Sequence, residues 1–228
     1  MSRVIIVFLG GPGAGKGTQA QALMPYLRIP QISTGDLLRA EVKRGTDLGV
    51  EIGKQLSTGK LVTDVIVNQL LGLRVKTADC TKGFMLDGYP RTLNQAVALN
   101  SQLRPKDKFL VIEIEVDHEQ IIERMLSRLT CTGCSRVYNT STMKPKTEGL
   151  CDACVTPLIH RSDDNEKVIR ERFCTFSDQT FPLRDYFKQL GVYSRVDGMR
   201  PSDEVTLDIL TVLDIEGVVV RSPVSRRV

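Results

Sequence analysis

A glycine-rich stretch with a single lysine occupies residues 10–18 and has the composition of a phosphate-binding loop. Glycines let backbone N–H groups converge on an anion, and the N-terminus of a following helix adds partial positive charge. An apolar run at 4–9 precedes the loop, and Lys16 would reach the outer phosphates. In the usual pattern of such a loop, a serine or threonine follows the lysine directly. Here Gly17 follows Lys16, and the hydroxyl group comes one position later, on Thr18. A flexible turn is the alternative, which the flanking strand and helix disfavour.

A carboxylate, Asp87, closes a second apolar run at 83–87, and Arg91 lies just beyond it. A carboxylate at the end of a buried strand can hold a Mg²⁺-bound water beside a nucleotide, or it can cap the helix that follows. The planar guanidinium of Arg91 suits a phosphate, although a surface position would also explain it.

Two further arginines, Arg124 and Arg128, are spaced i and i+4 in a segment predicted to be helical over 118–129. This spacing places both guanidinium groups on one helix face, where like charges repel mildly. A polyphosphate between them would convert the repulsion into attraction. A solvated basic face is an equally simple explanation.

Four of the six cysteines form two close pairs, namely Cys131, Cys134, Cys151 and Cys154. Two C-x2-C pairs at this separation are typical of a zinc knuckle, in which four thiolates close a tetrahedral structural site. The segment between the pairs has too few apolar residues for a core of its own, so a metal would supply stability. A disulfide or a metal-free knuckle is the alternative. Cys80 and Cys174 are expected to be small buried or semi-buried hydrophobic residues.

Bulk composition indicates an ordinary globular protein. The chain has 228 residues, 41% of them apolar and 25% charged, with a net charge of +4 and a pI near 8.7. The charge is too small to indicate nucleic-acid binding, and no apolar run reaches the ~18 residues of a membrane span. The N-terminus does not resemble a signal peptide, so an intracellular, cytoplasmic enzyme is expected. His118 and His160 form no nucleophile–base arrangement and are expected to be structural or at the surface.

The elements that must position these groups alternate between strand and helix. Strands are predicted at 3–9, 31–33, 83–87, 109–116 and 192–196, and helices at 16–24, 64–76, 118–129 and 203–213. Pro25 is expected to end the first helix, and Asp163 with Glu166 to cap a helix through Phe173. Residues 36–60 indicate a helical insert broken by glycines, and the tail at 216–228 is expected to be peripheral. The alternation predicts an α/β fold with a doubly wound parallel sheet, whose ligands bind at the carboxyl ends of the strands.

Several of these motifs together resemble the nucleoside monophosphate kinases, and among them the long-form adenylate kinases with a zinc-binding lid. The resemblance covers about residues 4–213 and rests on the loop at 10–18 and on four further segments, at 34–39, 59–64, 86–92 and 161–172. It implies a P-loop core with a five-stranded sheet and helices on both faces at 1–33, 64–126 and 165–228. It also implies an NMP-binding insert at 34–63 and a zinc-knuckle lid at 127–164.

The resemblance implies a reversible, Mg²⁺-dependent phosphoryl transfer from ATP to AMP that gives two ADP, carried out by a monomer. ATP would be bound by Gly13, Ala14, Gly15, Lys16, Gly17, Thr18, Arg124, Arg128 and backbone near Arg200. AMP would be bound by Thr34, Gly35, Arg39, Lys60, Leu61, Val62, Gly88, Arg91, Gln95, Arg161 and Arg172. Lys16, Asp87, Arg91, Arg128, Arg161 and Arg172 would carry the chemistry, with zinc on the four cysteines.

Two alternatives to this function are considered. The nearer is a sister kinase that uses GTP as donor or UMP or CMP as acceptor, because base choice rests on a few hydrogen bonds around Thr34 and Gln95. The more distant is a zinc-knuckle, P-loop protein that binds nucleic acid. The small net charge and the 5% aromatic content disfavour it.

Overall fold

A computed structural model describes residues 2–218, and the expectation for the tail falls mostly outside this range. A five-stranded parallel sheet in the order β2-β3-β1-β4-β8 forms its centre. The strands are β1 (Val4–Leu9), β2 (Gln31–Ser33), β3 (Gly83–Asp87), β4 (Lys108–Glu115) and β8 (Tyr193–Asp197). The prediction of a doubly wound parallel sheet is confirmed.

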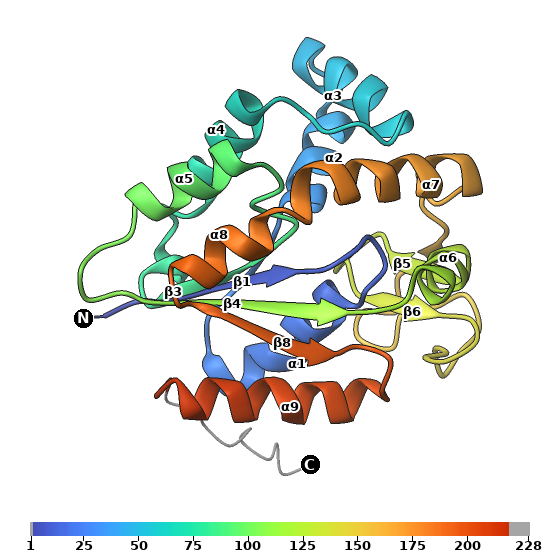
Figure 1. Cartoon of the computed structure of the whole chain (residues 1–228). Coiled ribbons are helices and arrows are strands. Elements are labelled where there is room, and N and C mark those ends of the chain that lie inside the picture. The colour runs from blue at the N-terminus through green and yellow to red at the C-terminus, as the bar shows by residue number, and fades with distance from the viewer. Residues whose placement is uncertain (1, 219–228) are drawn as a thin grey trace.

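Helices cover both faces of this sheet (Figure 1). Alternate residues of β1 point to opposite faces: Ile5 and Val7 pack in one buried cluster, Ile6 and Phe8 in the other. The first cluster is covered by α4 (Asp64–Arg74), α5 (Leu93–Ser101) and α8 (Leu183–Gln189), and the second by α1 (Lys16–Leu27) and α9 (Ser202–Ile215). A 3₁₀ turn, Ala78–Cys80, precedes β3.

Two inserts project beside the carboxyl ends of the strands. The first is a helical pair, α2 (Thr34–Arg44) and α3 (Asp47–Ser57). The second follows α6 (His118–Leu126) and is a small antiparallel sheet in the order β6-β5-β7, made of β5 (Arg128–Cys131), β6 (Val137–Asn139) and β7 (Leu158–Ile159). The chain returns through α7 (Glu166–Thr175) and a π-helical turn, Phe176–Thr180. This turn, α5, α8 and the three strands of the small sheet were not predicted.

Four local expectations are wrong. Helix α1 continues past Pro25 to Leu27, because a proline in the last turn removes only one hydrogen bond. Helix α6 ends at Leu126, so Arg128 lies on β5 and does not share a helix face with Arg124. Asn165 caps α7 by accepting from the Val168 N–H, and Asp163 has other partners. Cys174 is exposed.

The glycines of the first insert divide the helices only in part. Gly45 ends α2, as predicted, and adopts a left-handed conformation there, whereas Gly49 and Gly53 lie inside α3. A side-chain Cβ at Gly49 would lie 2.5 Å from the Glu41 carbonyl oxygen, so this glycine allows α2 and α3 to pack closely. Within residues 2–218, no helix combines the length and apolar character that a membrane span requires.

Candidate active site

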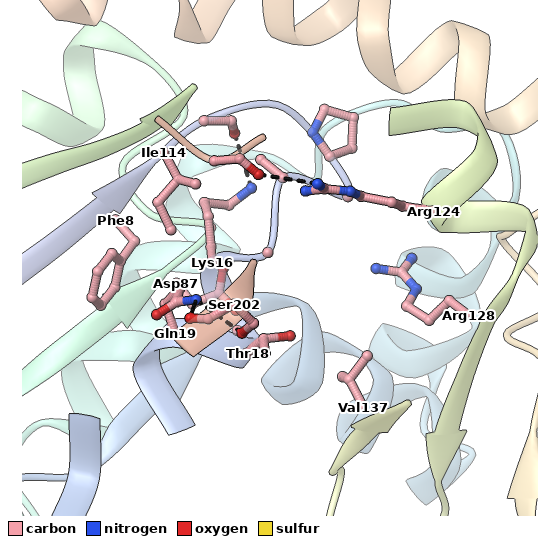
Figure 2. A pocket seen from close by; sticks show the side chains of 18 of the residues that line it. Phe8, Lys16, Thr18, Gln19, Asp87, Ile114, Arg124, Arg128, Val137 and Ser202 are labelled. Atoms are coloured by element: carbon pink, nitrogen blue, oxygen red, sulfur yellow. Dashed lines mark hydrogen bonds between the residues drawn. The ribbon is translucent and has the colours of Figure 1, made fainter. Parts of the chain in front are cut away.

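The phosphate loop joins the end of β1 to the start of α1. Gly13 and Gly15 adopt φ values of 84° and 95°, which side chains other than glycine rarely accept, and Gly15 is the N-cap of α1. The Lys16 ammonium donates to the Gly10 carbonyl at 2.9 Å and to the Gly11 carbonyl at 2.7 Å. The loop therefore holds its own lysine at the carboxyl edge of the sheet, where it faces the cleft (Figure 2).

Lys16 lies in an electropositive environment. Burial, together with the nearby Arg91, Arg172 and Arg128, lowers the pKa of its ammonium to about 8, although the Asp87 carboxylate opposes this shift. A lysine in this state gains more from an added phosphate than a solvated lysine does, because the phosphate supplies the missing counter-charge.

Asp87 is the last residue of β3 and lies against the phosphate loop. Its Oδ2 accepts a hydrogen bond from Gln31 at 3.3 Å, and a Cβ added at Gly17 would lie 3.0 Å from the same oxygen. Helix α5 begins at Leu93 with Thr92 as its N-cap. Asp87 is therefore not a helix cap, and it lines the cleft beside the loop.

A cleft of about 1070 Å³ runs from the phosphate loop to the second insert and to the start of α9. All the residues predicted to bind ATP line it: Gly13, Ala14, Gly15, Lys16, Gly17, Thr18, Arg124, Arg128 and Arg200. In Figure 2, Arg124 and Arg128 point into this cleft from α6 and β5. Although α6 ends between them, both guanidinium groups still reach the same space.

A smaller pocket of about 40 Å³ adjoins the cleft beneath the first insert. Of the residues predicted to bind AMP, it is lined by Thr34, Gly35, Arg39, Lys60, Leu61, Val62, Gly88, Arg91, Gln95 and Arg172. Arg161 is the exception and lines the larger cleft. Arg39, Arg91 and Arg172 line both spaces, so the two pockets meet at guanidinium groups.

Two adjacent carboxylates, Asp163 and Asp164, hold Arg172 and Arg128 in the wall of the larger cleft. Asp164, whose side chain is 1% exposed, accepts from Arg128 Nε at 2.8 Å and from its Nη2 at 2.5 Å. Asp163 accepts from Arg172 Nη1 at 3.0 Å and lies 3.8 Å from Arg39 Nη1. Sequence reasoning missed these roles and assigned Asp163 to a helix cap.

Arg161 and Arg124 are anchored on neutral groups. Arg161 Nε donates to the Thr130 hydroxyl at 2.9 Å, and Arg124 donates to the Gly198 carbonyl at 3.0 Å. Burial and nearby arginines lower the pKa of Arg161 to about 10, and burial lowers that of Arg172 to about 10 as well. Both groups therefore stay charged at neutral pH in surroundings that favour added negative charge.

Arg200 differs from the other arginines. Its guanidinium pairs with Glu204 and Asp208 along α9, at 2.6 Å and 2.5 Å, and its side chain is 43% exposed. The prediction that backbone near Arg200 contacts ATP therefore has one supporting observation, which is that Arg200 lines the cleft.

Thr34 and Gln95 lie in the wall of the smaller pocket and are buried. The Thr34 hydroxyl donates to the Gly88 carbonyl at 2.7 Å. The Gln95 amide donates to Asp64 at 2.6 Å and accepts from the Arg91 N–H at 2.8 Å. Sequence reasoning did not identify Asp64, and its only signal is its place at the end of the insert.

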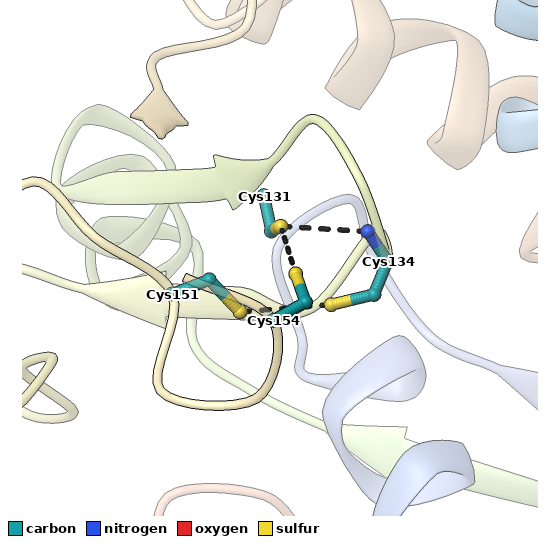
Figure 3. A group of neighbouring side chains, drawn as sticks. All are labelled: Cys131, Cys134, Cys151 and Cys154. Atoms are coloured by element: carbon teal, nitrogen blue, oxygen red, sulfur yellow. Dashed lines mark hydrogen bonds between the residues drawn. The ribbon is translucent and has the colours of Figure 1, made fainter. Parts of the chain in front are cut away.

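The four lid cysteines converge at the end of the small sheet (Figure 3). Their sulfur atoms all lie within 4.8 Å of one another; Cys131 Sγ is 3.3 Å from Cys154 Sγ, and Cys134 Sγ is 3.6 Å from Cys151 Sγ. Four thiolates at Zn–S distances of ~2.3 Å would lie ~3.8 Å apart. None of the six thiols forms a disulfide. Hydrogen bonds from the Tyr138 hydroxyl and from backbone N–H groups lower the pKa of the Cys151 thiol to about 6, whereas burial raises the pKa of the Cys134 thiol.

A parallel sheet with a phosphate loop and two adjoining pockets that share arginines defines the P-loop kinases that act on nucleoside phosphates. The model of the family "Adenylate kinase" matches residues 8–192. The chain belongs to the adenylate kinase family.

The chain is similar to curated adenylate kinases over almost their whole length. The adenylate kinase of Fervidobacterium nodosum is 43% identical over 210 residues, which cover 91% of this chain and 96% of that protein. The adenylate kinase of Archaeoglobus fulgidus is 41% identical over 211 residues, covering 92% and 97%. That of Thermotoga maritima is 41% identical over 211 residues, covering 91% and 96%. The expected class of enzyme is confirmed.

Proposed function

We propose that this chain transfers the γ-phosphoryl group of ATP to AMP, reversibly, and releases two ADP. The observation that carries the proposal is that the larger cleft and the smaller pocket share Arg39, Arg91 and Arg172. Two nucleotides that occupied these spaces would point their phosphates at the same guanidinium groups. This arrangement suits direct transfer between two phosphates.

Positioning and neutralisation of charge suffice for this chemistry. The acceptor is a phosphate oxygen that is already ionised, so no base has to remove a proton. Residues 13–18, with Arg124 and Arg128, would hold the ATP phosphates, and backbone near Arg200 would meet its adenine. Arg39 and Arg91 would hold the AMP phosphate. Lys16, Arg161 and Arg172 would stabilise the charge on the group in transfer.

The smaller pocket would hold the acceptor nucleoside. Thr34 and Gln95 would address the adenine base, and residues 60–62 with Gly35 and Gly88 would close the pocket around it. Their common place in the wall of this pocket supports the assignment, with Val62 and Gln95 buried beside it.

Magnesium would enter with the ATP phosphates and would supply charge neutralisation at the transferred group. Asp87 would hold it through water, because its oxygen lies beside the loop at Gly17 and oxygen is the ligand that Mg²⁺ prefers. Gly17 offers no hydroxyl, so phosphates and waters would provide most of the coordination.

Zinc would occupy the four-cysteine cluster as a structural ion. The sulfur separations suit a tetrahedral site, and four thiolates leave no open position for catalysis. Backbone N–H groups of Gly133 and Ala153 already donate to Cys131 and Cys151 sulfur atoms, as they would to bound thiolates.

The division into parts belongs to the same proposal: a core at 1–33, 64–126 and 165–228, an NMP-binding insert at 34–63, and a lid at 127–164. Closure of both inserts over the cleft would exclude water, which would otherwise take the phosphoryl group. We place the enzyme in the cytoplasm as a monomer.

The experiment is an assay of the full chain with Mg²⁺ and each pairing of ATP or GTP with AMP, UMP, CMP or GMP, read as diphosphate formed. ATP with AMP should give the highest kcat/KM. Faster turnover with GTP, UMP or CMP would assign the chain to a sister specificity. Salt-sensitive nucleic-acid binding without transfer would reject the proposal.

A further inference from the structure

The side-chain amide of Gln95 is held between two partners of opposite character. Its Nε2 donates to Asp64 Oδ1 at 2.6 Å, and its Oε1 accepts from the Arg91 N–H at 2.8 Å. A carboxylate can only accept and a peptide N–H can only donate, so the amide fits one way round. Turning it by 180° would place NH₂ against N–H and oxygen against carboxylate, and both bonds would be lost.

Asp64 is itself fixed. It is the first residue of α4, and its second oxygen accepts from the Thr92 hydroxyl at 2.8 Å. The N-terminus of α4 favours a negative charge at this place. Thr92 in turn accepts from the Gln95 N–H, so the carboxylate and the amide belong to one small network.

The two anchors leave one hydrogen of Nε2 and one lone pair of Oε1 uncommitted. Gln95 is 2% exposed and lines the smaller pocket. The pocket therefore receives a donor and an acceptor side by side, in an order that the protein fixes before any nucleotide arrives.

This order distinguishes two classes of purine. A 6-amino purine presents an acceptor at N1 and a donor at its amino group, which match the free donor and acceptor of the amide. A 6-oxo purine presents an N1–H donor and an O6 acceptor. The donor would then face the amide N–H, and the acceptor would face the amide oxygen. A freely turning amide would serve both classes equally.

We infer that Asp64 is a specificity-determining positioning residue: it locks the Gln95 amide so that the acceptor pocket takes 6-amino purine monophosphates and rejects 6-oxo ones. The inference rests on the proposed function, because it assigns the smaller pocket to the acceptor base. Asp64 acts through Gln95 and does not itself need to touch the nucleotide.

The first test uses the unmodified chain with Mg-ATP and three acceptors: AMP, the purine monophosphate without a 6-substituent, and inosine monophosphate. The unsubstituted purine keeps the N1 acceptor and has no group at position 6 that would face the Gln95 oxygen. A locked amide predicts kcat/KM in the order AMP, unsubstituted purine, inosine monophosphate. Inosine monophosphate used as well as the unsubstituted purine would overturn the inference.

The second test is Asp64→Asn. An asparagine at this position could accept from the amide or donate to it, so a turned Gln95 would keep one partner. The ratio of kcat/KM for AMP to that for inosine monophosphate should fall by about tenfold or more, as expected for a hydrogen bond to a charged group. An unchanged ratio in a folded variant would overturn the inference.

Tyr89→Phe is the matched control. The Tyr89 hydroxyl donates to Asn68 and to the Gln95 backbone carbonyl, in the same buried region, but not to the amide. This variant should lose stability and keep the selectivity ratio; an equal fall in the ratio would indicate general loosening and count against Asp64. Failure of the unmodified chain to phosphorylate AMP would reject the proposed function, whereas AMP turnover with a ratio insensitive to Asp64 would reject this inference alone.

Discussion

The Asp164 carboxylate accepts two parallel hydrogen bonds from the Arg128 guanidinium, from Nε to Oδ2 at 2.8 Å and from Nη2 to Oδ1 at 2.5 Å. Asp164 is almost fully buried and Arg128 largely so. Bidentate pairs of this kind fix the orientation of the guanidinium as well as its position. Asp164 therefore presents Arg128 to the cleft in one geometry.

Asp164→Asn should destabilise the protein by about 3 kcal/mol, because it leaves a buried arginine without its counter-charge. Thermal unfolding in the absence of nucleotide measures the change. The control is Glu166→Gln, which breaks the exposed Arg170 pair and should cost at most about 0.5 kcal/mol. Equal losses of stability in the two variants would show that the buried pair contributes no more to stability than the exposed pair does.

Lys16→Met should lower kcat by about two to three orders of magnitude, the usual loss when one charge-stabilising donor is removed. Methionine has a similar length and keeps the apolar stem, so the circular dichroism spectrum should not change. Lys16→Arg should not restore the rate, because a planar fork cannot take the place of the ammonium between the Gly10 and Gly11 carbonyls. Substantial activity in Lys16→Met would remove Lys16 from the transfer step.

Nucleotide binding should take up a proton at pH 8.5. In the free site the pKa of Lys16 is lowered to about 8, so the lysine is mostly neutral at that pH, and bound phosphate favours the charged form. The pKa thus rises on binding, and ATP affinity should fall as the pH increases above 8. Calorimetry in buffers of different ionisation enthalpy should give an uptake of about 0.5–0.8 proton.

The control for this measurement is Lys16→Met, in which the uptake at pH 8.5 should vanish. At pH 6.5 the unmodified lysine is already charged, so its contribution should also disappear there. Proton release at pH 8.5, or uptake that persists without the lysine, would contradict the assignment.

Removal of the lid metal should lower the unfolding temperature. Metal analysis of the purified protein should find about one zinc per chain, and Cys131→Ser should reduce both the zinc content and the thermal stability while leaving most of the activity. Cys174→Ser is the matched control, because Cys174 is exposed and lies outside the cluster. An equally stable metal-free Cys131→Ser protein would reject the structural role.

The predictable parts of the molecule were those set by local chemistry. The phosphate loop, the strands of the parallel sheet and the cysteine spacing each depend on residues close together in the chain. Nearly continuous apolar runs were enough to identify β1 and β4, because strands covered by helices on both faces of a sheet carry apolar residues on both sides.

The errors arose where a distant partner decides the structure. The periodicity of residues 118–129 continues into Arg128, but that residue pairs with Asn139 of β6 and lies in a strand. Asp163 has the right spacing for a helix cap, yet the arginines of two other elements compete for it successfully. Asn165 then takes the cap. The Asp64–Gln95 bond joins residues 31 positions apart and has no local signal.

The place of Gly17 restricts how this loop can be engineered. Replacing Gly17 with serine would place a hydroxyl group directly after Lys16, as in the usual pattern of such loops. The new Cβ, however, would press on the Asp87 oxygen at 3.0 Å and disturb the bond from Gln31. A serine at position 17 would therefore require the Asp87 carboxylate to move by a few tenths of an ångström, whereas the hydroxyl of Thr18 leaves that carboxylate in place.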